Sequence, residues 1–259
     1  MRLKTLKNAL LVTLSMALIG AASVAITYAA VHESFGEASN SFVGDKGINA
    51  TLTEVNWDGI AGNGDSTGYT SNDPRLGQNI AKSYIPGVAI PKDPKVNNTS
   101  SEAISEYVGI KASYTANAVP STGSSTVEYT YYTKTQFETA IAQLCKDATT
   151  PGISDNWEAN TAGTHFYYKN EVAQGSASTP VFTHVKVNAF TKGTDTNANY
   201  YVLKTYSSAS DTTGSDVYIK DLPQFKIQLT GYAISADGND TTQTNDWSDV
   251  KAALDALMA

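Results

Sequence analysis

The chain has 259 residues, with 18 Lys or Arg and 25 Asp or Glu, so its formal net charge at pH 7 is −7. An acidic chain without Lys and Arg clusters lacks the charge that binding to nucleic-acid phosphates requires, which excludes nucleic acid as a partner. The single cysteine, Cys145, excludes an internal disulfide framework.

The N-terminus has the three parts of a secretory signal. Basic residues precede an apolar run at 9–26, which ends in small residues at Ala29 and Ala30. We predict a signal peptide over 1–29, because cleavage after Ala30 would put the bulky Tyr28 where small residues are preferred. The alternative is a retained membrane anchor. We therefore expect secretion to the extracellular matrix or cell surface, with membrane contact only through the uncleaved signal.

The chain after the signal alternates short apolar runs with polar clusters rich in Thr, Ser and Asn. This pattern predicts an all-β sandwich, in one domain over 44–259. The predicted strands are 48–53, 106–115, 127–131, 181–187, a short strand near 200–206, and 225–233, with a hairpin joining Trp157 to 165–169.

Other segments predict loops and one or two short helices. Residues 56–83 are rich in Gly, Asn, Asp and Ser and are typical of a long surface loop. Pro91 and Pro94 restrict the next strand to an edge or an irregular start. Apolar spacing predicts a helix over 135–147, capped by Thr135 and Glu138, with Cys145 buried on its apolar face. The apolar stripe Trp247, Val250, Leu254 and Leu257 predicts a terminal helix.

Three blocks of sequence resemble one family of exported proteins. The first runs from the signal exit (TYAA) through Asn40-Ser41-Phe42 to GINATLTEVNWD at 47–58. The second is IPGVAIPKDPKVNN at 85–98, leading into YVGIK at 107–111. The third combines HFYYKNEVAQGSASTPVFTHVKV at 165–187 with FKIQLTGYAISADGND at 225–240. Together these blocks resemble the TasA and camelysin family of Gram-positive bacteria.

The resemblance implies a jelly-roll-like β-sandwich, with an alternate (SipW-type) signal peptide cut by a dedicated signal peptidase during export. It also implies polymerisation with copies of the same chain into biofilm matrix fibres, in which the freed N-terminal segment completes a neighbour's sheet. Here that candidate donor strand is 30–43, and its apolar anchors for assembly are Val31, Phe35 and Phe42. The alternatives are a first strand of the same subunit and a disordered terminus.

The family has also been linked to metal-dependent proteolysis. A helical zinc site needs two His one turn apart with a Glu beside them, but the chain has only His32, His165 and His184, none four residues from another. No Gly-x-Ser-x-Gly elbow or phosphate-binding loop is present. We therefore assign no catalytic residue, metal ligand or cofactor.

The leading interpretation is a secreted structural subunit of cell-surface or biofilm matrix fibres that assembles by donating its N-terminal strand. A camelysin-like metal-dependent surface protease and a monomeric surface adhesin remain the alternatives.

Overall fold

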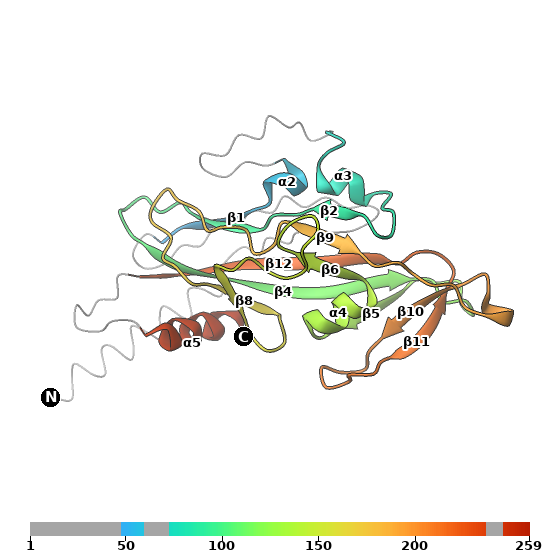
Figure 1. Ribbon diagram of the computed structural model, residues 1–259. Helices are drawn as coiled ribbons and strands as arrows, with labels where there is room; N and C mark the ends of the chain where they lie inside the picture. The colour runs from blue at the N-terminus through green and yellow to red at the C-terminus, as the bar shows by residue number, and fades with distance from the viewer. Residues whose placement is uncertain (1–47, 60–72, 237–245) are drawn as a thin grey trace.

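The computed structural model describes residues 48–59, 73–236 and 246–259. These residues form antiparallel strands in two layers around one apolar core, which confirms the all-β class (Figure 1). The strands are β1 (Ala50–Thr53), β2 (Ala89–Pro91), β3 (Lys95–Asn98), β4 (Glu106–Ala118), β5 (Val127–Tyr131), β6 (Ala142–Cys145), β7 (Trp157–Ala159), β8 (His165–Tyr168), β9 (His184–Val187), β10 (Tyr201–Thr205), β11 (Ser215–Ile219) and β12 (Gln224–Ser235).

The long strands β4 and β12 form the centre of the first layer. They pair from Glu106 with Ser235 to Asn117 with Gln224, and the other side of β4 pairs with β8 and β5. Side chains alternate along each strand, so the core-facing set on both strands is fully or nearly fully buried. This set is Val108, Ile110, Ala112, Tyr114 and Ala116 on β4, and Phe225, Ile227 and Leu229 on β12.

The second layer contains two small sheets, one of β1 with β3 and one in the order β2-β9-β6. Figure 1 shows β1, β2 and β9 above β4 and β12. The predicted edge position of the proline-containing strand is confirmed, because β2 ends at Pro91 and pairs on one side only, with β9. The segment at 175–178 covers the far side of β3 through backbone hydrogen bonds to Val96 and Asn98.

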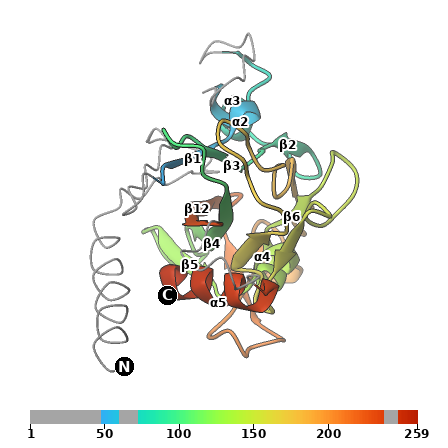
Figure 2. The same ribbon diagram turned by 90° about the vertical axis from the view of Figure 1, so that its left-hand side faces the viewer.

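The helices are α2 (Val55–Asp58), α3 (Gly77–Ala81), α4 (Lys134–Ala140) and α5 (Trp247–Met258). The described ranges thus contain four α-helices, more than the one or two short helices that the sequence predicts. The terminal helix α5 is confirmed and lies beneath the first layer (Figure 2). Its buried face is Val250, Leu254 and Met258, which pack on Tyr167 of β8. A Cβ at Gly109 of β4 would lie 2.2 Å from Met258 Cε, so the glycine leaves the space that the helix fills.

The prediction of one helix over 135–147 is wrong in its second half. Helix α4 ends at Ala140, and β6 then pairs with β9 from Ala142 with Val187 to Cys145 with His184. Ala142 and Leu144 are buried, whereas Gln143 between them is not. The apolar residues of 141–145 therefore fit a strand period of two as well as helical spacing. Pairing with β9 decides between the two periods. Cys145 is buried as predicted, but on a strand.

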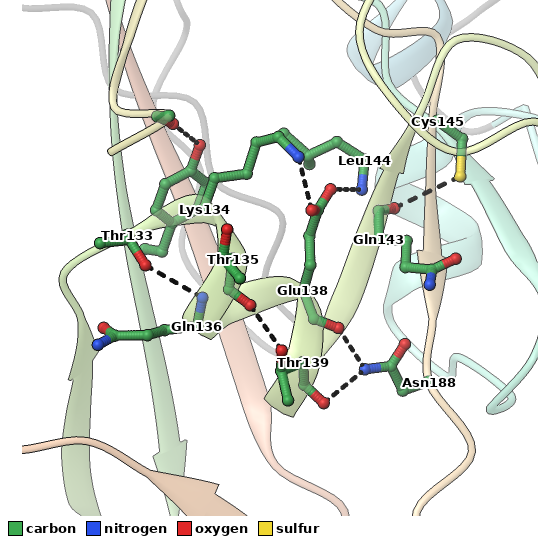
Figure 3. Close-up of polar contacts among 12 residues, drawn as sticks. Thr133, Lys134, Thr135, Gln136, Glu138, Thr139, Gln143, Leu144, Cys145 and Asn188 are labelled. Atoms are coloured by element: carbon green, nitrogen blue, oxygen red, sulfur yellow. Dashed lines mark hydrogen bonds and ion pairs between the residues drawn. The ribbon is translucent and has the colours of Figure 1, made fainter. Parts of the chain in front are cut away.

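The contacts around α4 explain where it begins and ends (Figure 3). Thr133, not Thr135, is the N-cap, because its Oγ1 accepts a hydrogen bond from Gln136 N at 3.1 Å. At the other end, Glu138 Oε1 accepts from Leu144 N at 3.1 Å and Oε2 pairs with Lys134 Nζ. One carboxylate therefore joins the helix to the strand that follows it.

Two further predictions need correction. The loop predicted at 56–83 includes parts of α2 and all of α3, and its centre, 60–72, lies outside the described residues. The predicted short strand near 200–206 is β10, and it pairs with a second strand, β11, that the sequence analysis does not predict. The polar start of β11, Ser215 and Asp216, hid the strand from apolar alternation.

Candidate functional site

The anchors Val31, Phe35 and Phe42, and the cleavage residues Ala29 and Ala30, lie outside the described residues. The signal, the donor segment 30–43 and the boundary at 44 therefore stay predictions. What the described residues offer is the other half of such an assembly, a sheet edge that can accept a strand.

The direction of the backbone groups on β12 follows from the ladder with β4. Glu106 of β4 exchanges two backbone hydrogen bonds with Val172, at 2.8 and 3.0 Å, on the side away from β12. The backbone N–H and C=O groups of the even-numbered residues of β4 therefore point away from β12. Those of the odd-numbered residues of β4 bond the even-numbered residues of β12. The N–H and C=O groups of the odd-numbered residues of β12 point outward: Phe225, Ile227, Leu229, Gly231 and Ala233.

We call these outward groups, from Phe225 to Ala233, the β12 edge. No strand of the described residues pairs with it, since β12 ends its sheet. The edge is long for one that no described strand pairs with, and β12 contains no proline to blunt it. The edge of β2, by contrast, carries Pro91. Natural proteins usually protect such an edge, so an unblunted one points to an intended partner strand.

Strand β1 packs beside β12 with no ladder between the two. Asn49 O accepts a hydrogen bond from Thr99 N, so the odd-numbered residues of β1 bond β3. The backbone groups of Ala50 and Leu52 therefore turn away from β3, while their side chains are fully buried. The two layers thus meet at β1 and β12 along strands that are not joined by hydrogen bonds.

A buried ion pair fixes the chain that follows β1. Lys92 Nζ lies 2.8 Å from both carboxylate oxygens of Glu54, donating to Oε2, and neither side chain is exposed. Lys92 also lies 4.5 Å from the centre of the Trp57 ring. Next to the pair, Asp93 accepts hydrogen bonds from Asn56 N at 2.7 Å and Asn56 Nδ2 at 3.0 Å. Burial, with the nearby Glu54 charge, raises the pKa of Asp93 to about 7.

His165 and His184 lie on strands, as predicted, but in different sheets, whereas His32 lies outside the described residues. His165 Nδ1 on β8 lies 2.9 Å from Asp255 Oδ1 of α5, and Tyr167 donates a hydrogen bond to the same oxygen. His184 Nδ1 on β9 lies 2.9 Å from Thr183 Oγ1, and burial lowers the pKa of His184. Within 48–59, 73–236 and 246–259, no three His, Cys, Asp or Glu side chains gather as a metal site would require.

Cys145 lies in an apolar setting. Its Sγ lies 3.7 Å from Gln143 O, and burial raises the pKa of the thiol. A buried thiol of raised pKa is a poor nucleophile. None of the described helices has the length and apolar character to cross a membrane.

Comparison of the chain with protein-family models, with curated proteins and with solved structures returns no match. The one sequence feature that points to this edge is the uninterrupted alternation of core-facing and outward side chains over Phe225–Ala233. It could not show that the strand stands at the end of a sheet, because that depends on which strands pair elsewhere.

Proposed function

We propose that the chain is a secreted structural subunit of cell-surface or biofilm matrix fibres. In this proposal, segment 30–43 of one subunit is released by signal cleavage and adds as a strand to the β12 edge of the next subunit, which completes a jelly-roll-like sandwich. The observation that carries the proposal is the β12 edge, with its outward backbone groups and no partner strand among the described residues.

Strand addition suits this edge physically. An added strand satisfies the outward N–H and C=O groups, and each backbone hydrogen bond contributes about 1 kcal/mol. The edge from Phe225 to Ala233 spans about 27 Å, whereas 30–43 reaches about 45 Å when extended. The donor segment is therefore long enough to cover the edge and still leave a linker to its own subunit.

Strand geometry ranks the three anchors. Val31 and Phe35 are four residues apart and project from the same face of a regular strand. Phe42 is seven residues from Phe35 and projects from the opposite face. The pair Val31 and Phe35 is therefore the one that would enter the apolar layer between β1 and β12.

Electron microscopy of the processed protein tests the proposal. We expect filaments from the full processed chain and folded monomers from a variant without 30–43. Phe35→Ser should reduce filament formation far more than its matched control Phe42→Ser. Filaments that persist without 30–43 would contradict strand donation by this segment.

A second set of variants tests the acceptor edge. Ala233→Pro removes an outward N–H but no hydrogen bond to β4, so the monomer should fold and fail to accept a strand. Ala233→Ser keeps the N–H and should assemble normally. Monodisperse particles under all conditions would favour the monomeric adhesin. Casein cleavage that is lost with chelator and restored by zinc would favour the metal-dependent protease.

A further inference from the structure

A partly buried chain of hydrogen bonds holds the start of β1. Asn49, the residue before β1, donates its backbone N–H to Ser100 Oγ at 2.9 Å. Ser100 Oγ in turn donates to Glu106 Oε1 at 2.6 Å. Thr99 holds the other backbone group of Asn49, with N and Oγ1 donating to Asn49 O at 2.7 and 3.0 Å.

The carboxyl group that ends this chain is unusually placed. Glu106 is fully buried, and its Oε2 has no hydrogen-bond partner. An ionised carboxylate left with one unsatisfied buried oxygen is costly, whereas a protonated one is neutral. Burial accordingly raises the pKa of Glu106 to about 7, against the lowering effect of Ser100 and the Asn49 N–H.

Neutral groups surround Glu106 in the described part of the chain. Ser100 comes from the loop after β3, Asn49 from the start of β1, and the backbone of Val172 from the segment after β8. Tyr107 and Glu171 bond each other on the solvent side of β4. Glu102, in the loop after β3, is exposed. No charged side chain of the described residues therefore compensates the carboxylate.

Protonation changes the direction of the hydrogen bonds along the chain. When Glu106 is ionised, Ser100 must donate its only hydroxyl proton to Oε1. When Glu106 is protonated, its own O–H can donate to Ser100 Oγ, and the Ser100 hydroxyl is released to donate to Asn49 O, which lies 3.5 Å away. Removal of the buried charge is the main difference between the two states, because Asn49 O already accepts two shorter hydrogen bonds from Thr99.

We propose that Glu106, Ser100 and Asn49 form a proton-dependent clamp on the start of β1, closed when Glu106 is protonated and loosened when it is ionised. The clamp sits at the start of β1, so it controls local opening of that strand. It does not depend on the proposed fibre function and would operate in a protein that stays monomeric.

Amide hydrogen exchange of the folded protein, measured by NMR at pH 5.5 and 8.5 and corrected for intrinsic rates, tests the clamp. We expect the protection factor of the Asn49 and Thr51 amides to fall at least tenfold between the two pH values. Glu106→Gln, which is neutral at both, should remove this dependence. Ser100→Ala should lower protection at Asn49 at both pH values.

The matched control is Asp93→Asn, which removes the other carboxyl of raised pKa while leaving the clamp intact. It should keep the pH dependence at Asn49 unchanged. A wild-type protection factor that does not change with pH would overturn the proposal, and so would a pH dependence that survives in Glu106→Gln. Because exchange is read in the monomer, this outcome is separate from whether filaments form.

Discussion

Raising the pH from 5 to 8 is expected to destabilise the folded protein through two buried carboxyl groups. The pKa of Asp93 rises from 3.8 to about 7 and that of Glu106 from 4.5 to about 7, in both cases mainly because of burial. The folded protein keeps these protons up to about pH 7, whereas the unfolded chain releases them near pH 4. Their contribution to stability is therefore complete below pH 4 and is lost as the pH rises to 7.

The size of the effect follows from the pH interval. Between pH 5 and 8 each group loses about 2.5 kcal/mol, because its folded-state pKa lies about two units above pH 5 and one pH unit corresponds to about 1.4 kcal/mol. The two groups together give about 5 kcal/mol. His184 offsets a part of this loss, because its lowered pKa adds stability as the pH rises through the folded-state pKa of His184 up to about 6.5. A net fall of several kcal/mol is a large share of the 5–15 kcal/mol typical of a folded domain.

Urea unfolding at constant ionic strength, at intervals from pH 5 to 8, measures this fall directly. In Asp93→Asn, the free energy of unfolding should fall with pH at about half the wild-type slope. The lost hydrogen bond to Asn56 Nδ2 lowers this free energy by the same amount at every pH and does not change the slope. A free energy of unfolding that is flat or rises across this range would refute the reasoning. An unchanged slope in Asp93→Asn would refute the part assigned to that residue.

Three further substitutions test the contacts that hold the elements together. Lys92→Met leaves Glu54 buried and unpaired, and should cost about 3–5 kcal/mol in urea unfolding, whereas the double variant Lys92→Met with Glu54→Leu should recover most of this loss. Gly109→Ala pushes on Met258 Cε and should cost about 1–3 kcal/mol, a cost that Met258→Ala in the same chain reduces. Thr133→Ala removes the N-cap of α4 and should lower the thermal unfolding free energy by about 1 kcal/mol, where no change would mean that the cap is not used.

The sequence predicted the elements whose periodicity is long and unambiguous. Buried and exposed side chains alternate over many residues in β4 and β12, and α5 has an apolar stripe at helical spacing. Each of these patterns fits only one type of secondary structure. The run that became β6 is four residues long and fits both periods, and its assignment depends on β9, which lies about forty residues later. Short runs are decided by pairing, which a single segment does not contain.

The candidate site was less accessible from the sequence than the fold. Sequence patterns could propose a donor segment, but not an acceptor, because an open edge is a property of the whole strand order. Buried polar contacts were equally hidden: Lys92 and Glu54 are 38 residues apart in the chain. Charged residues are usually read as surface residues, and only the fold shows that these two meet in the core.

The most direct test of the central claim adds a synthetic peptide of residues 30–43 to the processed protein from which this segment has been deleted, with amide hydrogen exchange on β12 as the measurement. We predict new protection at the outward amides, those of Phe225, Ile227, Leu229, Gly231 and Ala233. The even-numbered amides, which already bond β4, should change little. Protection that appears elsewhere, or none at all on β12 at saturating peptide, would contradict the assignment of this strand as the acceptor.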